Sequence, residues 1–173
     1  MSPRNARTSR TPAPTAGATE IAEALAALTA TPKAIARLAR GRPDALLHRP
    51  PGPDAWSARD VVAHLRACAD VWGRCIHRML AETHPTIRYV SPRGWIRKTD
   101  FLEQTFHDSL RTFTSDRAAL LEALRALGTP DWSRGATFTG TTAGREATVY
   151  SYARRIADHE LGHVDQIRRA LGG

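Results

Sequence analysis

The sequence predicts an all-α fold built from four main helices, with a short extra helix near the N-terminus. In each of four long segments the apolar residues recur every three or four positions, which is the period of a helix with one buried face. The alternation of apolar and polar residues that marks half-buried strands is negligible. No segment repeats another, so a solenoid of repeated units is not expected.

The length of 173 residues suits one domain that can bury a substantial core. Residues 1–17 are rich in Pro, Thr, Ala and Arg and contain no acidic residue, so they cannot bury enough apolar surface to fold alone. We therefore predict a disordered basic tail over residues 1–17 and a folded domain over residues 18–173.

Charge, hydropathy and cysteine content narrow the classes of function. The net charge of +8 comes partly from the tail and otherwise from helices where basic and acidic residues are interleaved, which does not favour nucleic-acid binding. No apolar run approaches the roughly 18 residues of a membrane span, and no secretory pattern opens the chain. Cys68 and Cys75 would lie about 10 Å apart on one helix, too far for a disulfide. We therefore expect a cytoplasmic protein.

Capping and turn residues set the predicted boundaries near the N-terminus. Thr19 can cap a first helix, and Thr31 followed by Pro32 is a typical start for a second, short helix that ends at Gly41. The proline-rich residues 42–54 then predict a stiff, extended connector.

The second long helix is predicted to begin after Trp56. Ser57 is a good N-cap, and Asp60 three residues later forms a variant of the capping box. A stripe of apolar side chains follows at helical spacing: Val61, Leu65, Cys68, Trp72, Cys75, Ile76 and Met79. His64 lies within this apolar zone. Alone it would be a buried core histidine, and beside further imidazoles it becomes a metal ligand.

Two more long helices are predicted in the C-terminal half. Residues 85–94 predict a loop, and residues 100–127 predict a helix that stops at Gly128. Residues 131–144 are rich in Thr and Gly and predict a structured loop before the last helix, residues 148–171.

The sharpest chemical signal is His159-Glu160-Leu161-Gly162-His163 on the last helix. Four residues turn a helix by about 400°, so the two imidazoles share one face and can bind one metal ion. The segment also matches the H-E-x-x-H pattern of zinc proteases. Those enzymes take a third ligand downstream of the second histidine, where this chain offers only Asp165, so the protease is the less favoured interpretation.

His64 is the natural third ligand from another helix. Three neutral imidazoles would leave a divalent ion with open positions, the arrangement of catalytic rather than structural sites. Glu160 is a candidate catalytic residue, although it points about 100° away from His159. Gln166, three residues after His163, can hold a ligand imidazole through a hydrogen bond.

Taken together, these motifs resemble the DinB-like superfamily (the DinB/YfiT type) of metal-dependent hydrolases and thiol S-transferases. The resemblance covers residues 21–171 and depends on four short segments in order: residues 53–57, residues 61–65, Asp131-Trp132 with the Gly140 loop, and residues 159–167. It implies a four-helix bundle with an unusual helix order, often dimeric. It also implies that His64, His159 and His163 bind a divalent metal ion.

The resemblance leaves the activity open. It implies a metal-dependent transferase or hydrolase that acts on a small molecule, with a low-molecular-weight thiol such as mycothiol or bacillithiol as a candidate cosubstrate. A dimeric bundle that binds metal without catalysis, or acts in a stress response, is the alternative, and the zinc protease ranks last. Zinc or nickel is expected first, while iron and manganese also accept three imidazoles. We expect a homodimer with no membrane or nucleic-acid partner.

Overall fold

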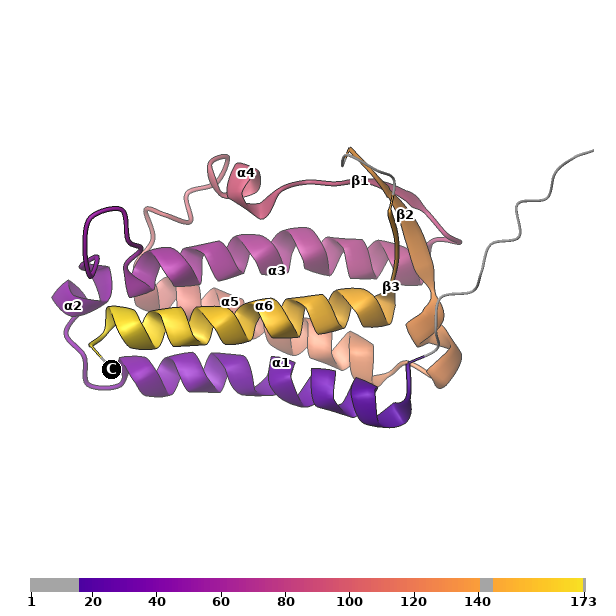
Figure 1. Ribbon diagram of the computed structural model, residues 1–173, viewed down its shortest axis with the longest axis horizontal. Coiled ribbons are helices and arrows are strands. Elements are labelled where there is room, and N and C mark those ends of the chain that lie inside the picture. Colours follow the sequence, from indigo (N-terminus) through magenta and orange to yellow (C-terminus); the bar gives the residue numbers. More distant parts are fainter. Residues whose placement is uncertain (1–15, 141–144, 173) are drawn as a thin grey trace, which may run out of the picture.

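The computed structural model describes residues 16–140 and 145–172. Four long helices form a bundle, so the predicted all-α class is confirmed (Figure 1). The elements in chain order are α1 (Ala18–Ala39), α2 (Asp44–His48), α3 (Ala58–Ala81), β1 (Thr86–Arg88), α4 (Pro92–Ile96), α5 (Phe106–Arg125), the 3-10 helix η1 (Thr129–Ser133), β2 (Gly135–Thr139), β3 (Arg145–Thr148) and α6 (Val149–Ala170). The predicted disordered tail lies outside the described residues except for residues 16–17. No described helix has the length and apolar character that a membrane span requires.

The order of the helices around the bundle is not their order along the chain. Helix α6 packs between α1 and α3, and α5 packs against the same two helices from the other side. Consequently α1 lies diagonally opposite α3, and α5 lies diagonally opposite α6. Helices α1 and α6 run in one direction while α3 and α5 run in the other (Figure 1).

The core consists of two large apolar clusters along the bundle and a small third one, in which Ala63 and Ala67 of α3 pack with Ile96 of α4. The cluster nearer α2 joins the start of α3 and α5 to the end of α1 and α6, for example Val61, Phe113, Ile35 and Ile167. The other large cluster contains Trp72 and joins the second half of α3 to the start of α6, next to the small sheet. Each large side chain buried in this way stabilises the fold by about 1.5–3 kcal/mol, so helix contacts dominate the stability of the bundle.

Caps fix the start of the two helices that carry the histidines. The Asp60 amide donates to the Ser57 hydroxyl at 3.2 Å, and the Ser57 amide donates to the Asp60 carboxylate at 3.1 Å, as predicted. At the start of α6 the Ser151 amide donates to the Thr148 hydroxyl at 3.1 Å. These bonds satisfy amides that the helix itself leaves unpaired, and they set where each histidine falls.

The predicted break at Thr31 and Pro32 is wrong, because α1 continues through both residues. Proline removes only its own backbone donor, while Leu28 and Ile35 on the same face are fully buried. The Thr31 hydroxyl donates to the Ala27 carbonyl within the helix rather than capping a new one. The predicted cap at Thr19 is also wrong, because α1 begins at Ala18 and its N-cap is Gly17, whose amide donates to the carboxylate of Glu20 at 2.8 Å.

Two further boundaries differ from prediction. The connector at residues 42–54 is not extended throughout, because it contains α2, which the fully buried Leu47 anchors to the core. The third long helix begins at Phe106 rather than near residue 100. The hydroxyl of Thr105 accepts from the amide of Asp108 at 3.1 Å, and this cap determines the start.

A small three-stranded sheet closes the end of the bundle opposite α2 (Figure 1). Strand β2 pairs in parallel with β1 and antiparallel with β3. Its strands are only three to five residues long, too short to establish an alternating pattern in the sequence. The sheet buries Ile87, Ala136, Phe138 and Ala147 against the core, which is why these segments extend where a loop was predicted.

Gly135→Ala should lower the free energy of unfolding by about 1–3 kcal/mol. A Cβ at Gly135 would lie 2.8 Å from the carbonyl oxygen of Ala147 on the paired strand, and this backbone atom can move only if the sheet moves. Gly73→Ala is the matched control, because no atom beyond the adjacent backbone of its own helix lies within 4 Å of its added Cβ, and alanine stabilises a helix interior by roughly 0.5–1 kcal/mol. Urea unfolding measures both, and equal stability of the two variants would contradict this account.

Candidate metal centre

Three histidines predicted as metal ligands meet where α3 packs against α6. The His64 ring centroid lies 5.3 Å from that of His159 and 4.9 Å from that of His163. The two rings on α6 lie 4.4 Å apart, and their Nε2 atoms are separated by 3.2 Å. The spacing of four residues therefore places both imidazoles on the face of α6 that turns to α3. Their role as ligands stays a prediction.

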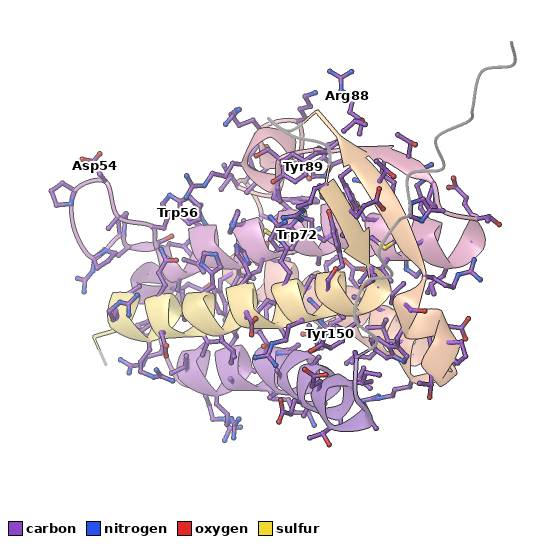
Figure 2. All side chains as sticks on the ribbon, turned by 45° about the vertical axis from the view of Figure 1, so that its right-hand side comes forward. Asp54, Trp56, Trp72, Arg88, Tyr89 and Tyr150 are labelled. Carbon is purple, nitrogen blue, oxygen red and sulfur yellow. The ribbon has the colours of Figure 1, made fainter. Side chains whose placement is uncertain are left out.

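Neighbouring side chains hold these rings in place. Gln166 Oε1 lies 2.8 Å from His163 Nδ1, the contact expected of a residue that orients an imidazole, so a proton on Nδ1 leaves the Nε2 lone pair free. Trp56 stacks on His163 at 6.5 Å, and Trp72 meets His159 edge-on at 4.8 Å. Both tryptophans lie on the α3 side of α6 (Figure 2).

The environment keeps the imidazoles neutral. Burial, then the charges of the other two histidines, lower the pKa of His64 to about 3. Burial and His163 lower the pKa of His159 to about 4, and burial also lowers the pKa of His163. Neutral imidazole is the form that binds a metal ion, so the site needs little deprotonation at neutral pH.

Cys68 is a possible donor that the sequence prediction assigned only to the core. Its Sγ lies 3.4 Å from His64 Nε2, and the donor atoms of His64, Cys68 and His159 lie within 4.8 Å of one another. Burial, with the charge of Glu160, raises the pKa of the Cys68 thiol. The sequence feature that could have identified Cys68 as a donor is its position four residues after His64, because the same spacing identified the histidine pair on α6.

Glu160 lies away from the histidines, in the core of the bundle. Its carboxylate accepts a hydrogen bond from Arg117 of the diagonally opposite α5, and both side chains are almost completely buried. Burial raises the pKa of Glu160, while the Arg117 guanidinium opposes that shift. A catalytic role for Glu160 stays a prediction, and the ion pair gives this carboxylate a structural contact instead.

The other acidic residues beside the motif turn outward. Asp158 forms an ion pair with Arg154 at 3.0 Å, and Asp165 pairs with Arg168, all on the exposed side of α6. Neither carboxylate faces the histidines, so the zinc protease gains no downstream ligand from Asp165.

The donor set fits a divalent metal ion. Zinc–nitrogen bonds of about 2.0–2.1 Å at a tetrahedral angle place two ligand nitrogens about 3.3–3.4 Å apart. The separation of 3.2 Å between the His159 and His163 Nε2 atoms agrees with that value. Buried His159 Nδ1 has no hydrogen-bond partner among the described residues, so the contact of this ring with a neighbouring imidazole is through its Nε2 atom alone.

A cavity of about 870 Å³ opens beside the histidines. His64, His163 and Gln166 line it together with Trp56, and its remaining walls come from the α2–α3 connection, the first turn of α3, α4, the α4–α5 connection and the end of α6. Its volume is within the range of small-molecule sites, roughly 300–1,000 Å³. A ligand in the cavity would therefore contact two of the three histidines directly.

A helical bundle in which clustered histidines line a cavity defines a class of candidate metal-dependent proteins. Residues 27–167 match the DinB superfamily, and the chain belongs to this family. The predicted resemblance is thereby confirmed.

The fold also matches a solved structure from Bacillus subtilis. YfiT is described as a probable metal-dependent hydrolase with an unusual four-helix bundle topology. The match has a TM-score of 0.78 at 20% identity and covers 93% of this chain and 91% of that one. At this identity the likeness establishes the fold and, with it, the unusual helix order. No curated protein sequence matches the chain.

Proposed function

We propose that this protein is a metal-dependent hydrolase or transferase whose divalent ion is held by His64, His159 and His163. The observation that carries the proposal is the meeting of three neutral imidazoles from two helices, two of which line a cavity sized for a small molecule. The description of YfiT as a probable metal-dependent hydrolase supports it. With three protein ligands the ion would keep an open position for substrate.

The residues around the cavity would have different roles in the site. When bound, a divalent ion would lower the pKa of a water molecule or thiol that it contacts, and the deprotonated form is a nucleophile at neutral pH. Gln166 would hold His163 in the orientation that turns Nε2 to the ion, while Trp56 and Trp72 would exclude water from the sides of the cluster. A substrate that fills the cavity would lie against His64 and His163.

We also propose a cosubstrate, a metal, an oligomeric state and a cellular compartment for this protein. The open position suits the sulfur of a low-molecular-weight thiol such as mycothiol or bacillithiol, which would attack an electrophilic second substrate. Zinc or nickel is proposed as the metal, with iron or manganese as alternatives. A homodimer in the cytoplasm is the proposed state of the protein.

Turnover by the metal-loaded protein tests this function. We expect it to accelerate the reaction of mycothiol or bacillithiol with 1-chloro-2,4-dinitrobenzene, or the hydrolysis of p-nitrophenyl acetate, followed by absorbance. His159→Ala should return the rate to that of the uncatalysed reaction, because the site then lacks one ligand. His107→Ala, an exposed histidine on α5, should leave the rate unchanged. Metal-loaded protein that accelerates none of these reactions would contradict the proposal.

The alternative is a bundle that binds metal without catalysis. The observation that favours it is Cys68, because a fourth protein donor beside His64 and His159 would close the site. The zinc protease is the weakest candidate, since the carboxylate it requires as general base is bound to Arg117 in the core.

A further inference from the structure

Three arginines with no ion-pair partner among the described residues line the cavity beside the histidines. Arg93 and Arg97 are four residues apart on and just after α4, which places them on the same face of that helix. Arg169 lies on α6, three residues beyond Gln166, and also lines the cavity. None of the three forms an ion pair within residues 16–140 and 145–172. By contrast, Arg59 in the same wall is paired with Asp60 at 3.0 Å.

The charge of this wall is therefore unbalanced. Among the described residues, Asp54 is the only other acidic residue lining the cavity, so three uncompensated guanidinium groups share the wall with one carboxylate. Like charges four residues apart on a helix repel one another, and the repulsion of Arg93 and Arg97 is relieved when an anion lies between them. A cavity wall of one sign also raises the local concentration of oppositely charged ligands.

Arg93 connects this basic wall to the histidines. Its guanidinium lies 5.7 Å above the ring of Trp56, and the same ring stacks against His163 at 6.5 Å. Trp56 thus holds Arg93 in place by a cation–π contact on one side and contacts the metal-site histidine on the other. Ile96 and Leu102 add apolar surface to the same cavity.

We propose that the cavity binds a small organic anion through Arg93, Arg97 and Arg169. The carboxylate or phosphate group of this ligand would lie against the guanidinium groups, whose planar pairs of N–H donors match both kinds of oxyanion. Its carbon skeleton would lie on Trp56, Ile96 and Leu102, with the remaining end directed at His64 and His163. The placement of the ligand's reacting end at the histidines rests on the proposed function. The placement of its anionic end rests on the arginines alone.

Binding of succinate and of inorganic phosphate, measured by calorimetry at low ionic strength on metal-free and metal-loaded protein, tests the proposal. We expect at least one of these anions to bind metal-free protein, and the neutral analogue succinamide to bind much more weakly. Arg93→Gln with Arg97→Gln should weaken that binding by about tenfold or more, because charge-assisted hydrogen bonds are lost. Stronger binding of succinate than of phosphate would identify the ligand as a carboxylate, and the reverse would identify it as a phosphate.

Arg88→Gln is the control, because it removes one positive charge from strand β1 of the small sheet, well away from Trp56 (Figure 2). It should leave the affinity unchanged. Equal weakening by Arg88→Gln would show that net charge rather than the cavity attracts the anion, and absence of binding by wild-type protein would also overturn the proposal. Metal content measured on the same samples separates the two proposals: a protein that binds metal but no anion refutes only this inference, and one that binds anion but no metal refutes only the metal centre.

Discussion

His64→Ala should abolish metal binding, reducing the metal content from close to one ion per chain to almost none. Helix α3 contributes only one of the three histidines, His64. Without it, the site keeps only His159 and His163, two ligands on one helix. Two imidazoles without a third protein ligand bind zinc or nickel far more weakly than a complete set. The measurement is metal content by mass spectrometry after reloading with zinc or nickel and desalting.

Two control variants decide which donors form the site. Cys68→Ser should retain the metal, because His163 rather than Cys68 lines the cavity and would complete the three-histidine set. His163→Ala should lose the metal as His64→Ala does. If Cys68→Ser lost the metal while His163→Ala retained it, the ion would belong to the group of His64, Cys68 and His159 instead. Circular dichroism on each variant confirms that the bundle has folded.

Glu160→Ala should destabilise the fold by about 3–5 kcal/mol, the typical cost of removing one partner of a buried ion pair. The substitution leaves the Arg117 guanidinium charged, fully buried and unpaired in the centre of the bundle. Asp158→Ala on the exposed side of the same helix removes an ion pair to Arg154 and should cost less than about 1 kcal/mol. Chemical unfolding of the two variants gives the comparison.

The double variant Arg117→Met with Glu160→Leu separates structure from catalysis. Apolar side chains of similar volume can replace a buried ion pair at little cost, so the double variant should recover most of the stability that Glu160→Ala loses. It should also keep the metal and the turnover of wild type, because neither residue touches the histidines. Loss of turnover in a stable, metal-loaded double variant would instead make Glu160 a catalytic residue.

The local parts of this structure were the predictable ones. The cap at Ser57 and the shared face of His159 and His163 depend on residues three or four apart, so helix geometry alone predicts them. The approach of His64 to that pair depends on which helices are neighbours, so the residues alone offered His64 only as a candidate third ligand, and the family resemblance supported that choice. The partner of Glu160 could not be predicted, because Arg117 is on a helix diagonally across the bundle and nothing in its local sequence marks it as buried.

Two failures have a different cause. A proline following threonine ordinarily signals a new helix. Here α1 continues past Pro32 because burial of the flanking apolar residues stabilises the uninterrupted helix. The sheet joins residues 86–88 to residues 135–148, and such short strands form only because the bundle offers them an apolar surface. In both cases tertiary packing outweighed local preference.

The helix order has a consequence for biosynthesis. His64 and His163 lie about 100 residues apart in the chain, and contacts of such long range form late because the intervening loop must first be closed. During translation α3 emerges with His64 as the only one of the three predicted ligands, and it has no partner helix for the site until α6 has been made. A nascent chain would therefore lack the complete proposed ligand set, so the proposed metal ion would be acquired only by the completed, folded protein.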